Sequence, residues 1–303
     1  MHRSPSQTDE TVYLDYDQSA LDRAYTQTEW ADNIDTLLAG WLRRSSECRD
    51  THPRYSEHAY GPGPSELLDV FDADGATVHF HIHGGAWQRQ TKEDCSFIAP
   101  AMQAIGIPFV VPEFGRLPDT SMPDVLDQIA RALVWTFETY VRTGRARDLV
   151  VSGHSSGAHM AALLTSYDFA GALPPSCLRT VLCISGAYDL APVMLSARSR
   201  YIDLSPEQAF RLSPIERTAE MTAPVHLLYA QNESPEFCRQ SQAFAKKLKA
   251  EGMLAGYRRM PARNHFEIAD DLADPGTDTG RYLKRLLIPE RTTPTLNTSP
   301  SPT

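Results

Sequence analysis

Short apolar runs alternate with longer amphipathic segments along most of the chain. Continuous apolar runs are typical of strands buried on both faces, whereas apolar residues three and four positions apart are typical of helices. The pattern predicts strands over residues 55–60, 67–71, 77–83, 108–112, 149–151, 179–185, 225–229 and 254–259. It predicts helices over residues 95–105, 122–143, 158–165, 235–252 and most of 266–287. Because strands and helices alternate, we expect an α/β fold with a mostly parallel central sheet and helices on both faces.

Two segments fall outside this alternation. Apolar and aromatic residues recur at helical spacing over residues 19–49, which predicts one or two amphipathic helices that either cap a site or pack beneath the sheet. Residues 186–221 are polar and loop-rich, and an insertion there is where a lid or a substrate pocket is expected. We expect a flexible N-terminus over residues 1–12, a single domain over residues 13–288 and a disordered Pro-, Thr- and Ser-rich tail over residues 289–303.

Composition and charge narrow the class of protein. The chain has 303 residues, of which 42% are hydrophobic, and this suits one large globular domain. Its formal net charge of −9 argues against nucleic acid or an anionic membrane surface as a partner. We therefore expect a small-molecule substrate, and the composition leaves a homodimer open.

Cysteine usage and the N-terminal residues indicate the compartment. The five cysteines are dispersed without a C-x-x-C pair, which is typical of reduced thiols in the cytoplasm. Residues 1–11 lack the apolar core of a signal peptide, and no apolar run approaches the ~20 residues that span a bilayer. We expect a cytoplasmic protein. His79, His81 and His83 alternate on one predicted strand, but the two glycines after them indicate another role for His83, and no metal site is expected.

The segment Gly153-His154-Ser155-Ser156-Gly157 joins the apolar run 149–151 to the helix-forming run 158–165. A strand, a sharp turn and a helix with serine at the apex form the G-x-S-x-G nucleophile elbow. The strained turn needs small neighbours, which Gly153 and Gly157 provide. The helix N-terminus behind the serine favours developing negative charge. The sequence therefore predicts Ser155 as a nucleophile.

A serine hydroxyl needs a base, usually a histidine oriented by a carboxylate, and after this elbow the acid precedes the histidine in the chain. His265 follows the last predicted strand and is the expected base, because the alternative, His226, lies inside a strand. The acid should follow the strand that ends at residue 229. Glu233 is favoured by position; Glu236, in the first turn of the next helix, and Asp189, after the preceding strand, stay as alternatives.

The segment His83-Gly84-Gly85-Ala86-Trp87 directly follows a predicted strand. Glycines there let backbone N–H groups approach a substrate, so we expect the amides of Gly84, Gly85 and Ser156 to form an oxyanion hole. Trp87 is expected either to form a pocket wall or to pack against the sheet. Tyr188, in the insertion, is a candidate for stacking on an aromatic substrate, as is Tyr201.

These motifs together resemble the kynurenine formamidase (arylformamidase) branch of the α/β-hydrolase family. The resemblance covers roughly residues 13–287. It is carried by Leu21-Asp22-Arg23-Ala24-Tyr25 with Trp30, by the segments 83–87 and 153–159, by Glu233-Ser234-Pro235-Glu236-Phe237 through Ser241, and by Asn264-His265-Phe266.

The resemblance implies an α/β-hydrolase fold, Glu233 as the triad acid, and a serine hydrolase that cleaves a small N-formyl or N-acyl aryl amide, such as N-formylkynurenine. It implies that neither a metal nor an organic cofactor takes part. Two alternatives stay open: a carboxylesterase of short-chain acyl esters, and a catalytically inactive relative that only binds a ligand.

Overall fold

One sheet of eight strands runs through the molecule in the order β1-β2-β4-β3-β5-β6-β7-β8. The computed structural model describes residues 10–288, so most of the predicted flexible N-terminus and the whole predicted tail, residues 289–303, lie outside the described residues. The strands are β1 (Tyr55–Ala59), β2 (Leu67–Phe71), β3 (Thr77–Ile82), β4 (Phe109–Pro112), β5 (Asp148–His154), β6 (Leu178–Ile184), β7 (Val225–Ala230) and β8 (Leu254–Met260).

The sheet is parallel from β4 to β8 and antiparallel where β2 meets β1 and β4. Successive side chains of a strand point to opposite faces of the sheet. In β5, Leu149 and Val151 belong to the hydrophobic cluster on one face, and Val150 belongs to the cluster on the other. Both faces of a central strand are therefore apolar, which is why these strands are continuous apolar runs in the sequence.

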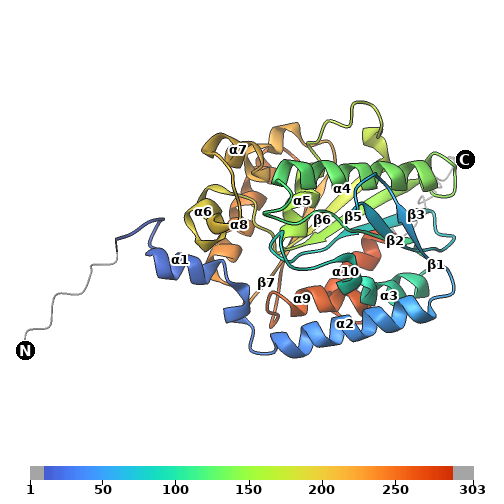
Figure 1. Ribbon diagram of the computed structural model, residues 1–303, viewed down its shortest axis with the longest axis horizontal. Coiled ribbons are helices and arrows are strands. Elements are labelled where there is room, and N and C mark those ends of the chain that lie inside the picture. Colours follow the sequence, from blue (N-terminus) through green and yellow to red (C-terminus); the bar gives the residue numbers. More distant parts are fainter. Residues whose placement is uncertain (1–9, 289–303) are drawn as a thin grey trace, which may run out of the picture.

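Helices cover both faces of the sheet (Figure 1). Buried residues of α4, α5 and α8 share the cluster of Leu149 and Val151, whereas those of α2, α3, α9 and α10 share the cluster of Val150. The helices are α1 (Gln18–Ala24), α2 (Ile34–Thr51), α3 (Ala99–Ala104), α4 (Met122–Thr136), α5 (Ser156–Leu164), α6 (Ala191–Leu195), α7 (Pro206–Arg211), α8 (Pro235–Ala250), α9 (Glu267–Asp270) and α10 (Asp278–Leu287). None of the helices within residues 10–288 combines the length and the hydropathy needed to cross a membrane.

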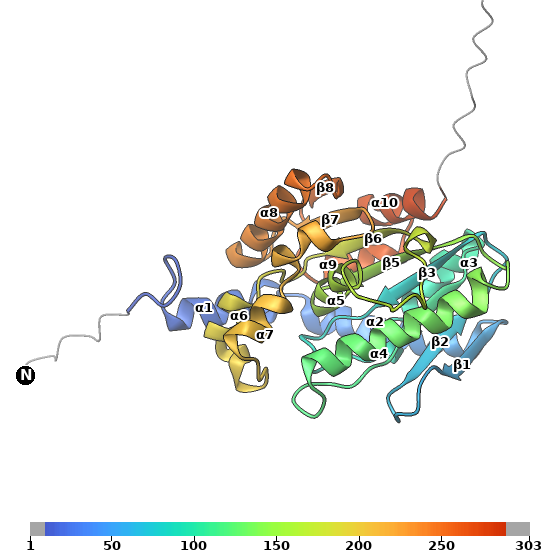
Figure 2. The ribbon, with the colours of Figure 1, turned by 90° about the horizontal axis from the view of Figure 1, so that it is seen from above.

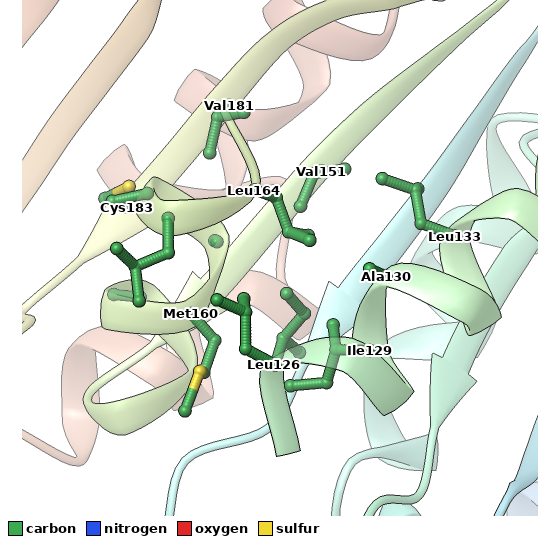
Figure 3. Packing of buried hydrophobic residues seen from close by; sticks show 14 of the residues in the cluster. Leu126, Ile129, Ala130, Leu133, Val151, Met160, Leu164, Val181 and Cys183 are labelled. Atoms are coloured by element: carbon green, nitrogen blue, oxygen red, sulfur yellow. The ribbon is translucent and has the colours of Figure 1, made fainter. Parts of the chain in front are cut away.

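Figure 3 shows how α4 and α5 pack on the centre of the sheet. The side chains that meet there are Leu126, Ile129, Ala130 and Leu133 of α4, Met160 and Leu164 of α5, and Val151, Val181 and Cys183 of the sheet. Burying an aliphatic side chain contributes about 1.5–3 kcal/mol to stability. Every residue of α5 is buried. The helix that begins next to Ser155 is therefore held firmly in place.

All predicted strands are present, with bounds that differ from the prediction by a few residues. The helix predicted over 122–143 is interrupted, because α4 ends at Thr136 and a π-helical turn, Phe137–Val141, follows it. Residues 186–221 contain α6 and α7 rather than only loop. Pro192 and Pro206 occupy the first turns of these helices, where proline is tolerated although it interrupts a helix elsewhere.

The N-terminal segment forms the expected amphipathic helices, α1 and α2, joined by a 3₁₀ turn over Gln27–Trp30. In both ribbon views α1 lies beside α6 of the insertion (Figures 1 and 2). Gln18 Nε2 donates a hydrogen bond to the Leu195 carbonyl (2.9 Å), and Ala197 N–H donates to Asp22 Oδ1 (2.6 Å). The N-terminal segment and the insertion are thus joined to one another.

Candidate active site

Ser155 lies in the turn between β5 and α5, with φ +56° and ψ −120°. A side chain on either neighbouring glycine would collide with the backbone. A Cβ on Gly153 would lie 2.1 Å from the Gly157 oxygen, and a Cβ on Gly157 would lie 2.1 Å from the Ile82 oxygen. Both glycines are therefore required for this turn, as the elbow motif predicts.

The turns after β7 and β8 bring two further polar side chains to Ser155. Glu233 precedes α8 and His265 precedes α9. Ser155 Oγ lies 3.0 Å from His265 Nε2, and His265 Nδ1 lies 3.1 Å from Glu233 Oε1. In a neutral His265, Nδ1–H donates to the Glu233 carboxylate and Nε2 accepts the Ser155 hydroxyl proton. The three residues are far apart in sequence and form one hydrogen-bonded chain.

Burial governs the electrostatics of this chain. Ser155, Glu233 and His265 are each 6% exposed or less. Loss of hydration lowers the pKa of His265, and positive charge on Arg198 acts in the same direction. Loss of hydration likewise raises the pKa of Glu233. The imidazole is therefore held neutral, the state that accepts a proton from a serine hydroxyl.

The loop after β3 turns sharply beside Ser155. Gly85, Ala86 and Trp87 all have positive φ, at +96°, +55° and +61°. Gly85 and Ala86 line the cavity next to Ser155. Gly84 is buried behind them, and a Cβ there would lie 3.2 Å from the Ser155 Cβ. Of the two glycines expected to supply oxyanion donors, Gly85 lines the cavity and Gly84 does not.

Ser156 begins α5, where the first backbone N–H groups of a helix have no acceptor within the helix. Its side chain has a separate role, because Ser156 Oγ accepts a hydrogen bond from the Trp87 N–H at 3.1 Å. This contact ties the loop after β3 to the elbow. The loop after β3 and the first residue of α5 are therefore held together next to Ser155.

A cavity of about 520 Å³ opens over Ser155 and His265. Its wall comes from four separate parts of the chain: the N-terminal segment between residues 22 and 42, the loop between residues 85 and 94, the insertion between residues 196 and 201, and the triad segments. The N-terminal segment therefore contributes to the wall of the site, and α2 also packs on one face of the sheet, so both alternatives that the sequence left open are met. Tyr201 lines this cavity, as expected.

Two candidates for substrate contact do not line the cavity: Trp87 packs in the core, the second of its two expected roles, and the prediction for Tyr188 is wrong. Trp87 is 1% exposed, and its Nε1–H donates to His159 Nδ1 at 3.3 Å. Tyr188 is fully buried and stacks on Phe244 with ring centroids 4.4 Å apart. Large aromatic rings gain most by full burial, and both of these rings belong to the hydrophobic core.

The alternative triad residues have other partners. Glu236 accepts a hydrogen bond from Tyr25 Oη at 3.0 Å and forms a two-pronged ion pair with Arg239. Asp189 accepts from the Ala191 N–H at 3.0 Å. His226 hydrogen-bonds the Tyr282 hydroxyl at 2.6 Å. Each residue stabilises a local structure, and none contacts Ser155 or His265.

The alternating histidines of β3 also have structural partners. His79 and His81 both hydrogen-bond Ser152 Oγ at 2.7 Å, and His83 stacks on Phe114 with ring centroids 4.2 Å apart. Within residues 10–288 no three His, Cys, Asp or Glu side chains are grouped closely enough to hold a metal ion.

The sequence did not identify two features of the cavity wall. Ala86 reaches the cavity because three successive residues are left-handed, and an alanine carries no sequence signal for that conformation. Arg198 lies in a 3₁₀ turn, Ala197–Arg200, within the insertion. Arginine is common on surfaces, and only the packing of α1 against the insertion places this one in the cavity.

Comparisons with known proteins agree with this architecture. A family model described as alpha/beta hydrolase fold matches residues 79–268. A kynurenine formamidase of Salmo salar is 27% identical over 278 residues, which cover 86% of this chain and 94% of the relative.

Two solved structures have similar folds. A thioesterase candidate from Silicibacter sp. tm1040 has a TM-score of 0.76 at 23% identity, covering 85% of this chain and 96% of that one. The carboxylesterase EstE1, from a metagenomic library, has a TM-score of 0.66 at 16% identity, covering 84% of this chain and 93% of that one. The α/β fold and the family resemblance predicted from the sequence are confirmed.

Proposed function

The chain belongs to the α/β-hydrolase family, and we propose that it is a serine hydrolase that cleaves a small N-formyl or N-acyl aryl amide, such as N-formylkynurenine. The observation that carries the proposal is the chain of contacts from Ser155 Oγ through His265 to Glu233 at the floor of a cavity. The similarity to a kynurenine formamidase over 86% of this chain supports the choice of an amide.

In this proposal Ser155 Oγ attacks the carbonyl carbon while His265 Nε2 takes the hydroxyl proton. The amides of Gly85, Ala86 and Ser156 stabilise the oxyanion. The C–N bond then breaks, and His265 returns the proton to the departing amine, which leaves an acyl ester on Ser155. A water molecule, deprotonated by His265, attacks this ester. The bond between the acyl carbon and Ser155 Oγ breaks, His265 returns the proton to Ser155 Oγ, and the carboxylic acid leaves. Glu233 keeps the imidazole in the required tautomer and stabilises the imidazolium.

A carboxylesterase is the second candidate. The same three side chains and the same oxyanion donors would hydrolyse an ester through the same acyl-enzyme intermediate. The fold similarity to EstE1 agrees with this chemistry but does not choose the substrate. An inactive binding protein is disfavoured, because the hydrogen bonds needed for turnover are intact.

The test is to measure kcat/KM of the purified protein for N-formylkynurenine and for p-nitrophenyl acetate. A clear preference for the formamide supports the proposal, and turnover of the ester alone favours the carboxylesterase. Ser155→Ala should abolish turnover and labelling by a fluorophosphonate probe while the protein stays folded. Retention of a substantial part of the activity by this variant would exclude Ser155 as the nucleophile.

A further inference from the structure

Arg198 brings a positive charge into the cavity that contains Ser155 and His265. Its Nη2 donates a hydrogen bond to the Tyr25 carbonyl at 2.6 Å. Its Cζ lies 5.6–5.9 Å from the ring centroids of Tyr25, Trp87 and Phe237. The carbonyl and the three rings hold the planar guanidinium in one place, so its remaining N–H groups have a defined direction.

This guanidinium has no carboxylate partner among residues 10–288. Loss of hydration lowers the pKa of Arg198, and the nearby Arg89 lowers it further. A partly buried cation without an anionic partner is costly, and a bound anion would offset that cost. The energy balance at Arg198 therefore favours an anionic ligand.

Arginines outnumber carboxylates among the charged groups that line the cavity, three to two. Arg89 and Arg200 also line the cavity, and within the described part of the chain neither forms an ion pair. The two carboxylates of the wall accept hydrogen bonds from other residues: Asp22 accepts from the Ala197 N–H (2.6 Å) and from Gln18 Nε2 (2.9 Å), and Asp94 accepts from the Thr91 N–H (2.9 Å). A chain with a formal net charge of −9 has thus gathered three arginines around its candidate active site.

We propose that Arg198 is the specificity-determining residue of this site, and that it binds a carboxylate carried by the substrate. The inference rests on the proposed hydrolase function, and it adds that the preferred substrates carry a carboxylate. A planar guanidinium matches a carboxylate with two parallel hydrogen bonds, a geometry that a lysine cannot reproduce. Arg89 and Arg200, at the exposed part of the wall, attract the same anion from solution.

The experiment compares matched substrates that differ only in the carboxylate. N-formylanthranilate and formanilide form the amide pair, and 4-acetoxybenzoate and phenyl acetate form the ester pair. Removing a hydrogen-bonded charge costs binding, so Arg198→Gln should lower kcat/KM for the carboxylate member of each pair by about 10- to 100-fold, mainly through KM. The neutral member should lose much less, so the ratio of the two kcat/KM values measures the contribution of the carboxylate. A thermal melt shows that the variant is folded.

Two further variants complete the design. Arg198→Lys keeps the charge but loses the two-pronged geometry, and should give a KM between those of the wild type and Arg198→Gln. Arg211→Gln removes an exposed arginine of the same insertion that forms an ion pair with Glu207 outside the cavity. This variant should leave kcat/KM unchanged for both substrate pairs. An equal loss for charged and neutral substrates in Arg198→Gln, or no loss for either, would overturn the proposal.

The two substrate pairs separate this inference from the proposed function. If the wild type hydrolyses the esters but neither formamide, the proposal that this protein cleaves an amide is wrong. The ester pair still measures whether Arg198 selects a carboxylate. If the wild type prefers phenyl acetate to 4-acetoxybenzoate, the carboxylate-binding role is wrong even if formanilide is hydrolysed well.

Discussion

His154 donates a hydrogen bond from Nε2 to the main-chain oxygen of His265, at 2.8 Å. A carbonyl oxygen only accepts, so the proton of His154 is on Nε2. The centroids of the His154 and His265 imidazole rings lie 4.6 Å apart. The end of β5, which presents Ser155, therefore also positions the loop that carries the base.

We expect His154→Phe to lower kcat about tenfold or more, because a small displacement of a base is enough to slow proton transfer. The ring contact with His265 persists, but the buried carbonyl loses its donor, at a cost of about 1–3 kcal/mol in the free energy of unfolding. Steady-state kinetics and a thermal melt measure both effects. His226→Phe, on β7, is the control and should leave kcat unchanged; an unchanged kcat in His154→Phe would exclude the positioning role.

The choice of acid is tested by three substitutions. Glu233→Gln keeps the volume but removes the negative charge beside His265 Nδ1, and should lower kcat by about 10³–10⁴-fold. Glu236→Gln and Asp189→Asn alter residues with other partners and should retain most activity. Measured kcat values that place Asp189→Asn or Glu236→Gln below Glu233→Gln would show that the assignment of the acid is wrong.

A substitution at Gly85 tests whether the loop after β3 forms the proposed oxyanion hole. A Cβ at Gly85 would lie 2.4 Å from the Gln90 nitrogen, and φ is +96°, so Gly85→Ala must displace the loop. Loss of an oxyanion donor typically lowers kcat by about 10²–10³-fold, which is the expected effect.

The matched control for this substitution is Gly144→Ala. Gly144 also has positive φ (+78°), but a Cβ there has open space. This variant should lose about 1–2 kcal/mol of stability from backbone strain and keep full activity. If both variants lose only stability, the loop after β3 does not contribute to turnover.

The acyl group should be small, because the amides of Gly85, Ala86 and Ser156 must lie close to the carbonyl oxygen. One additional methyl group commonly changes discrimination by about 10–200-fold. We therefore expect N-formyl aryl amides to exceed their N-acetyl counterparts at least about tenfold in kcat/KM. Equal values would contradict a tight acyl pocket and favour a broader amidase or esterase.

Acid should destabilise the fold through its buried histidines. Burial lowers the pKa of His79 and His154 from 6.5 to about 3, and that of His159 to about 4. Between pH 6.5 and 4 the unfolded chain binds protons that the folded protein excludes, so stability falls as the pH falls through this window. Each such histidine lowers the free energy of unfolding by up to about 2 kcal/mol at pH 5.

Thermal melts between pH 7 and pH 5 measure this effect. His79→Gln should give a smaller decrease in Tm over that range, because the variant has one buried histidine fewer at which the folded state excludes a proton. His58→Gln changes an exposed histidine and should leave the decrease as it is in the wild type. An identical pH dependence of Tm in the wild type and in His79→Gln would show that His79 does not contribute to the acid destabilisation.

The sequence alone determined the order of strands and helices, the elbow at Ser155 and the candidate base at His265. These features depend on local physics: apolar periodicity distinguishes buried strands from amphipathic helices, and a strained turn admits only small neighbours. Position along the chain narrowed the acid to Glu233, Glu236 and Asp189. The distance from Glu233 to His265 distinguishes these candidates, because only the turn before α8 brings a carboxylate to Nδ1.

Only the tertiary structure decided what surrounds the reacting groups. Trp87 and Tyr188 look like substrate contacts in the sequence, yet both rings are buried in the core, because the exposure of a side chain depends on packing between distant elements. Ala86 and Arg198 carry no local signal, yet both line the cavity. The contact of α1 with the insertion joins residues more than 170 positions apart, and periodicity along the chain contains no information about that distance.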